Sequence, residues 1–211
     1  MREVLVVAFG NENSHDLYVA GHAMVHTLRR AGRPAIWGFD TGVFADQRVN
    51  LYDCVVLATC PTVLTAEEQK GLDRYIRAGG GFVGVHACNL FAESGYDVFG
   101  SIIGSRVRGH PPHGRFRVRI VADHPVTRGL EDFDIEDEMF VTEWIGKPRQ
   151  VLAAADHEGR EHPMVYVQSL DKGRTAYIAL GHDGRAWHNP GFIRLLLEAV
   201  NWAGIAGSEE P

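Results

Sequence analysis

Two short apolar runs of the sequence end on histidine, and these histidines are the first candidates for chemistry. Residues 82–85 lead into His86, and residues 178–180 lead through a glycine into His182 and Asp183. If both runs are parallel strands of one sheet, both histidines emerge at its carboxyl edge, where open α/β sheets bind their ligands. An imidazole in that position can act as a general acid or base near neutral pH, or it can bind a metal ion.

Further residues could bring polar groups to the same edge. Asp137 and Glu138 stand in an otherwise apolar stretch, and His110 lies in a proline-stiffened loop at residues 109–113. Several imidazoles with one carboxylate suit zinc or another divalent ion, and they equally suit acid–base catalysis without a metal. No HExxH motif is present. The candidate catalytic residues are His86, Glu138, His182 and Asp183. The candidate metal ligands are His86, His110 and His182.

Residues that follow other elements could contact a substrate bound at this edge. His15 and Asp16 come after the first apolar run, and Asn89 follows the first of the two histidines. Trp187 or Trp144 could stack on a ring of a bound ligand, although packing in the core is the commoner role of a lone tryptophan. The candidate substrate-binding residues are His15, Asp16, Asn89 and Trp187.

The remaining histidines and the cysteines carry weaker indications of chemistry. His22 and His26 are four residues apart on an expected helix, but at about 100° per residue they lie opposite its apolar stripe, which predicts solvated side chains. We expect His113 on the outer side of its loop. Cys88 has no base placed beside it by the sequence, and a buried cysteine usually serves packing. The histidines expected in turns or on hairpin surfaces are His124, His157 and His162.

The elements that must position these residues alternate between strands and helices. Buried strands are predicted in the first half at residues 4–9, 35–39, 54–58 and 82–85. Strands are predicted in the second half at residues 116–120, 151–155, 163–167 and 175–180. Helices are predicted at residues 17–31, at 66–78 after a capping box of Thr65 and Glu68, at 91–104, and at 190–203 after an Asn189 cap. This order predicts an α/β fold with a mostly parallel central sheet and helices on both faces.

The glycines at positions 79, 81 and 84 spell the GxGxxG pattern of dinucleotide-binding proteins. That fingerprint follows a strand and opens a helix, whereas these glycines follow a helix and enter a strand. Gly79 is instead placed to end the preceding helix in a left-handed conformation. We therefore expect no nucleotide cofactor.

Composition narrows the class of protein. The chain has 211 residues, of which 45% are hydrophobic and 23% are charged, as in a globular protein with a sizeable core. A net charge of -6 disfavours nucleic acid as a partner, and no apolar run is long enough to span a membrane. Three cysteines without CxxC spacing favour a reduced, cytoplasmic location. We expect one domain over residues 1–207 and a frayed tail at 208–211.

The ordered set of motifs along the chain resembles the ThuA-like, or trehalose utilisation, family. The resemblance covers residues 2–204, and the whole set is more specific than any one motif. One departure is Tyr166, where the family often has tryptophan. The motifs are residues 64–68 with 79–87, 109–111, 124–130, 137–140, 173–174 with 180–183, and 190–203.

This resemblance implies a class I glutamine amidotransferase-like fold, which is a flavodoxin-like three-layer sandwich. In the amidotransferases a cysteine stands on the elbow after a strand, and a His–Pro–Glu segment follows a later strand. Here His86 resembles the elbow residue and His182 with Asp183 resembles the later segment, so glutamine hydrolysis is not expected. The family is linked to trehalose and related disaccharides, including 3-keto sugars.

We therefore predict an enzyme of carbohydrate metabolism, with a sugar as its small-molecule substrate and a histidine-rich site that suits zinc or another divalent metal. Neither nucleic acid nor a membrane is an expected partner, and a homo-oligomer is compatible with the sequence. Two alternatives stay open, because a fold does not establish an activity. One is a non-catalytic module that binds a sugar or a partner, and the other is a small metallohydrolase that acts on a non-sugar substrate.

Overall fold

The computed structural model describes residues 2–10 and 15–204 of the chain. The predicted tail at 208–211 lies outside these described residues, as do the last three residues of the predicted domain. None of the described helices has the length and apolar character that crossing a bilayer requires.

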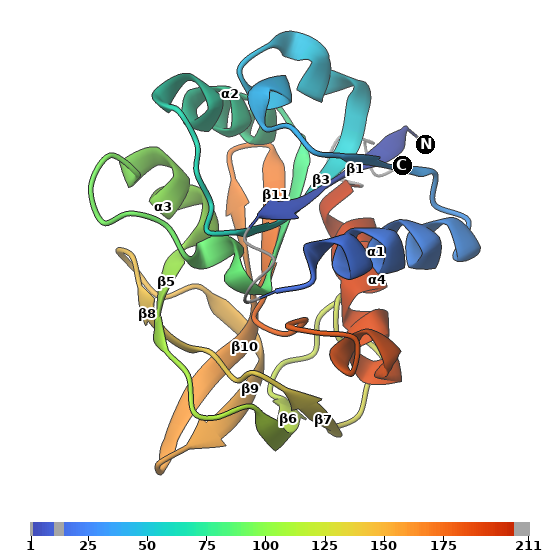
Figure 1. Cartoon of the computed structure of the whole chain (residues 1–211), viewed down its shortest axis with the longest axis vertical. Coiled ribbons are helices and arrows are strands. Elements are labelled where there is room, and N and C mark those ends of the chain that lie inside the picture. Colours follow the sequence, from blue (N-terminus) through green and yellow to red (C-terminus); the bar gives the residue numbers. More distant parts are fainter. Residues whose placement is uncertain (1, 11–14, 205–211) are drawn as a thin grey trace.

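Five neighbouring parallel strands form one half of the central sheet, in the order β2-β1-β3-β4-β11 (Figure 1). Helices cover both faces of this half, which explains why its strands are continuous apolar runs with no polar alternation. Residues Val4 to Ala8 of β1 are buried on both faces of the sheet. The strands are β1 Glu3–Gly10, β2 Ala35–Gly38, β3 Tyr52–Cys60, β4 Gly81–Val85 and β11 Gly173–Ile178.

The other half of the sheet is antiparallel and continues from β11 in the order β10-β9-β6-β7. The central sheet is therefore mixed, with a parallel core. These strands are β6 Gly114–Ile120, β7 Phe133–Asp137, β9 Gln150–His157 and β10 Arg160–Leu170. A separate two-stranded sheet pairs β5 Ser105–Gly109 with β8 Val141–Trp144. Figure 1 shows most of these antiparallel strands below the parallel half, while β10 extends upward beside β11.

Two helices cover each face of the parallel strands, which confirms the three-layer α/β sandwich (Figure 1). Helices α1 and α4 lie on one face, and α2 packs with α3 on the other. Helix α3 is shorter than the predicted 91–104, because Gly95 adopts a φ of +78° that a helix cannot include. The helices are α1 Leu17–Arg30, α2 Ala66–Arg77, α3 Asp97–Ile103 and α4 Pro190–Gly204.

Both predicted helix caps are confirmed. The Thr65 hydroxyl accepts a hydrogen bond from the Glu68 amide at 3.2 Å, and the Glu68 carboxylate accepts one from the Thr65 amide at 2.6 Å. The Asn189 side chain accepts a hydrogen bond from the Phe192 amide at the start of α4. A Cβ on Gly81 would lie 2.6 Å from the Ala203 carbonyl carbon, so this glycine lets α4 pack directly against β4. This close packing positions β4, whose last residue, Val85, is followed by His86.

Candidate metal centre

Three histidines and one glutamate converge at the carboxyl edge of the parallel strands. One ligand atom from each of the four side chains lies within 4.8 Å of the other three. His15 immediately precedes α1, His86 follows β4, Glu138 follows β7 and His182 follows β11. We call these four residues the His/Glu cluster. The sequence placed His86, Glu138 and His182 together at this edge, and it placed His15 beside them as a substrate contact.

One oxygen of Glu138 is the centre of the cluster. Its Oε2 atom lies 3.3 Å from Nδ1 of His182, 3.4 Å from Nε2 of His86 and 4.0 Å from Nε2 of His15. The ligand nitrogens of His86 and His182 are themselves 3.3 Å apart. Three imidazole nitrogens and a carboxylate around one point form the donor set that a tetrahedral zinc ion accepts.

The ring of His86 is held in an orientation that suits a metal ligand. His86 begins the 3₁₀ turn His86–Asn89 with a left-handed φ of 48°, which turns its side chain back over the sheet edge. Its Nδ1 lies 2.9 Å from the Ala179 carbonyl oxygen, to which a protonated Nδ1 donates a hydrogen bond. That bond leaves the lone pair of Nε2 directed into the His/Glu cluster. The ring also stacks on Phe140 at a centroid distance of 4.0 Å.

His15 supplies the strongest test of whether these residues fit a metal ion. It is buried, and neither of its ring nitrogens has a hydrogen-bond partner among the described residues. Burial and the neighbouring imidazoles of His86 and His182 lower the pKa of His15 to about 4, so the ring is neutral at physiological pH. A buried polar group without a partner is costly, and a metal–nitrogen bond would satisfy it. The His/Glu cluster therefore fits a metal.

The charges of Glu138 and His182 are coupled. Burial alone would raise the pKa of the Glu138 carboxyl, but the neighbouring imidazoles of His182 and His86 hold it well below its ordinary value. The hydrogen bond to Glu138 in turn raises the pKa of His182. Glu138 is thus an anion at every physiological pH and is available as a ligand.

Asp137 positions the cluster without belonging to it. Its fully buried carboxylate accepts hydrogen bonds from three backbone amides: Glu138 at 2.8 Å, Gly181 at 2.7 Å and His182 at 3.0 Å. The side chain therefore ties the end of β7 to the loop after β11. The sequence analysis considered Asp137 only as a source of charge, whereas its contacts assign it to backbone organisation.

An open pocket of about 490 Å³ gives access to the cluster, and His110 stands at its mouth. His110 Nδ1 lies 3.1 Å from Oε1 of Glu138, the carboxylate oxygen that the other histidines do not contact, and its side chain is 45% exposed. His110 was predicted as a metal ligand, but the structure places it outside the set of four. Cys60 also lines this pocket, at the end of β3, and burial raises the pKa of its thiol to about 11.

Asp183, a predicted catalytic residue, is not a member of the His/Glu cluster, although it follows His182 directly in the chain. Its carboxylate is paired with Arg185 at 2.5 Å and lies 3.5 Å from Nε2 of His113. The prediction that His113 faces outward is wrong, since its ring centroid is 5.7 Å from that of His182. The reason is the pairing of Gly114 with Asp137, which brings the start of β6 to the cluster.

Three residues that were predicted to contact the substrate have structural roles instead. Asp16 caps α1 by accepting a hydrogen bond from the Val19 amide at 2.9 Å. Asn89 is fully buried and donates to the Ser105 hydroxyl at 3.1 Å. Trp187 packs edge-on against Phe192 in the core. None of the three lines the pocket, because each is used by local capping or packing. Of the predicted substrate contacts, the pocket contains His15 alone.

The residues with weaker indications of chemistry lie outside the His/Glu cluster. Cys88 is completely buried and burial raises the pKa of its thiol, which removes it as a nucleophile. His22 and His26 are exposed and stacked on the outer face of α1, as predicted. His124 accepts a hydrogen bond from the Val126 amide in the predicted turn. Phe140, which packs under His86, is a site residue that the sequence analysis missed.

The sandwich fold and the turn after β4 that carries His86 place the chain in the class of glutamine amidotransferase-like α/β proteins, with histidine on the elbow. The ThuA family model, described as trehalose utilisation, matches residues 3–203. The chain therefore belongs to the ThuA family. No curated protein sequence matches it.

Solved structures share the fold at low sequence identity. A putative ThuA-like protein from Parabacteroides merdae is 22% identical, with a TM-score of 0.81, over 100% of this chain and 93% of that one. A second, from Bacteroides uniformis, is 19% identical with a TM-score of 0.80, over 95% and 90%. A β-galactosidase from Rahnella sp. R3 is 16% identical with a TM-score of 0.69, over 97% of this chain but 31% of the enzyme.

Proposed function

We propose that the protein is a metal-dependent enzyme of carbohydrate metabolism. A divalent ion, with zinc as the first candidate, is held by the three imidazoles and the carboxylate of the His/Glu cluster. The observation that carries this proposal is His15, a buried neutral imidazole with no hydrogen-bond partner among the described residues, whose Nε2 lies 4.0 Å from Oε2 of Glu138. A structural role alone would leave that ring unsatisfied.

The residues around the cluster suit chemistry on a polar small molecule. A bound ion would polarise a carbonyl oxygen or lower the pKa of a water molecule. His110 stands between the open pocket and Glu138, so it can pass a proton between a substrate hydroxyl and the Oε1 atom 3.1 Å away. The pocket volume of about 490 Å³ lies in the range of small-molecule sites.

The proposed substrate is trehalose or a related disaccharide, including its 3-keto form. Support comes from the family, whose description is trehalose utilisation. Glutamine hydrolysis is not proposed, because the elbow carries His86 and burial raises the pKa of both the Cys60 and the Cys88 thiol. A cytoplasmic location is likewise proposed, since the three cysteines are free thiols.

The test is turnover by zinc-loaded protein, incubated with trehalose, other disaccharides and their 3-keto forms and followed by NMR of the products. We expect one of these sugars to be converted, and Glu138→Gln to slow the conversion by about 100-fold or more. His22→Ala, on the outer face of α1, is the matched control and should leave the rate unchanged. Metal and sugar binding without turnover would refute the enzyme and favour the binding module. Absence of bound metal would refute the metal-dependent proposal.

A further inference from the structure

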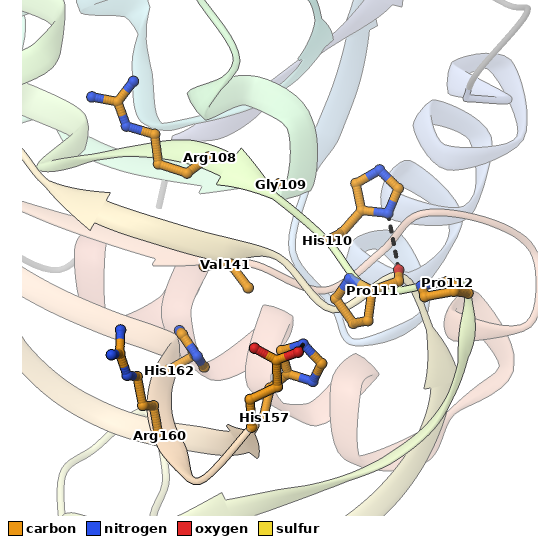
Figure 2. A pocket seen from close by; sticks show the side chains of 10 residues that line it. Arg108, Gly109, His110, Pro111, Pro112, Val141, His157, Arg160 and His162 are labelled. Atoms are coloured by element: carbon orange, nitrogen blue, oxygen red, sulfur yellow. Dashed lines mark hydrogen bonds and ion pairs between the residues drawn. The ribbon is translucent and has the colours of Figure 1, made fainter.

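A second, larger pocket adjoins the first and is lined mainly by basic groups. It has a volume of about 650 Å³ and shares Arg108, Gly109 and His110 with the pocket of the His/Glu cluster. Figure 2 shows the loop Gly109 to Pro112 on one side and the turn of the β9–β10 hairpin, with His157, Arg160 and His162, on the other. We call it the outer pocket. One elongated ligand could therefore extend from the outer pocket, alongside His110, into the pocket of the His/Glu cluster.

The pleat of the β9–β10 hairpin separates basic from acidic side chains. His157 pairs with Arg160 in the strand register, and His162 is two residues further along, so these three point to the same face. Asp156 and Glu161 form the neighbouring pair and point to the opposite face. There both carboxylates bind Arg119 of β6, at 3.0 and 2.8 Å.

This separation leaves Arg160, on the hairpin face of the outer pocket, without an acidic partner in the strand register. Among the described residues, no carboxylate lies within ion-pair distance of Arg160. The one acidic side chain lining the outer pocket, Glu158, lies 3.9 Å from His157. Burial lowers the pKa of His162, and the neighbouring His157 and Arg160 lower it further. Arg108 is neutralised by Glu93 and Glu143 and adds no free charge.

We propose that the outer pocket binds the phosphoryl group of a phosphorylated sugar, whose sugar part extends past His110 to the His/Glu cluster. This inference rests on the proposed function and narrows its substrate class. A phosphorylated sugar would bring a counter-charge to the exposed guanidinium of Arg160, whereas an uncharged disaccharide would not. A phosphate monoester offers two negative charges and several acceptor oxygens, which match the Arg160 fork and the N–H groups of His157 and His162.

The test compares the binding of trehalose 6-phosphate, trehalose and inorganic phosphate by isothermal titration calorimetry on zinc-loaded protein. We expect wild type to bind the phosphorylated sugar at least about tenfold more tightly than the neutral one. The double variant Arg160→Gln/His162→Gln should lose that preference while keeping its affinity for trehalose. Arg115→Gln is the matched control, because Arg115 is an exposed arginine of β6 paired with Asp134 outside the pocket. It should behave as wild type.

Two results would overturn this inference. One is equal affinity of wild type for the phosphorylated and neutral sugars. The other is a preference for phosphate that survives Arg160→Gln/His162→Gln, which would place the anion elsewhere. Either result can be told apart from failure of the proposed function, because the metal content of wild type and of each variant is measured in the same samples. Either of these two results, obtained with intact metal binding, refutes the outer-pocket proposal alone.

Discussion

His86 and Glu138 lie 3.4 Å apart, between Nε2 and Oε2, although the strands that deliver them are separated by four others in the sheet. His86 follows β4 in the parallel half, and Glu138 follows β7 at the far antiparallel edge. The connection is Asp137, whose carboxylate binds the backbone of the loop after β11, next to β4. The antiparallel half of the sheet therefore brings its last strand back to the carboxyl edge of the parallel strands.

Replacement of Asp137 by asparagine should loosen this connection. An amide has one acceptor oxygen where the carboxylate uses two, so one buried backbone N–H loses its partner. We expect the free energy of unfolding to fall by about 1–3 kcal/mol and the metal affinity by about tenfold or more. Urea denaturation and a competitive zinc titration measure the two quantities.

Asp132→Asn is the matched control for this change. Asp132 accepts one backbone hydrogen bond, from the Ile120 amide at 2.8 Å, in an exposed setting. Water can replace that bond, and the metal affinity should not change. Equal effects of the two substitutions would show that Asp137 has no special role in positioning Glu138 and His182.

The elbow conformation of His86 makes a second prediction. A residue with a side chain pays about 1–2 kcal/mol for the left-handed region that glycine enters freely. Both His86→Gly and His86→Ala remove the imidazole, but the first also relieves the strained backbone. Metal-free His86→Gly should therefore be more stable to urea than His86→Ala, by about 1 kcal/mol. The reverse order would mean that the turn after β4 relaxes when the imidazole is absent.

His15 predicts how the stability of the metal-free protein depends on pH. Its pKa is about 4 in the folded chain and 6.5 in the unfolded one, so the unfolded chain binds more protons between these values. The free energy of unfolding should fall as the pH drops from about 6.5 to about 4, with a His15 contribution on the order of 3 kcal/mol. The raised pKa of His182 acts in the opposite direction, adding stability as the pH falls.

Comparison of wild type with His15→Asn isolates the His15 contribution, because asparagine does not titrate. The difference in unfolding free energy between the two should shrink or shift in favour of the variant as the pH falls through this window. Glu138 has little effect on this comparison. Because its pKa is lowered in the folded chain, its contribution to the free energy of unfolding is lost only as the pH falls below its ordinary pKa of 4.5. A difference that stays constant from about pH 6.5 to about pH 4 would contradict a neutral His15 in the folded state.

The parallel half of the fold could be predicted because its signals are local. Apolar runs mark β1, β3 and β4, and the Thr65 and Asn189 caps mark the starts of α2 and α4. No local sequence pattern indicated the order in which the antiparallel strands pair. Strands β6, β7, β9 and β10 were visible at most as single segments, and the order in which they pair depends on contacts distant in sequence.

The same distinction explains the site. His86 and His182 could be predicted from the ends of parallel strands, which lie at one edge whatever the rest of the chain does. The inward position of His113 could not, because it depends on the pairing of Gly114 with Asp137 across 23 positions of sequence. The role of His15 as a cluster member was equally hidden, since its lack of a hydrogen-bond partner among the residues that the structure describes is a property of packing.

The measurement that tests the central claim most directly is the metal content of the purified protein by mass spectrometry, after zinc loading and dialysis. Wild type and the surface control His22→Ala should hold about one zinc ion per chain, and folded His86→Ala should hold less than about a tenth of that. Stoichiometric zinc in His86→Ala, or none in wild type, would contradict a metal centre at His15, His86, Glu138 and His182.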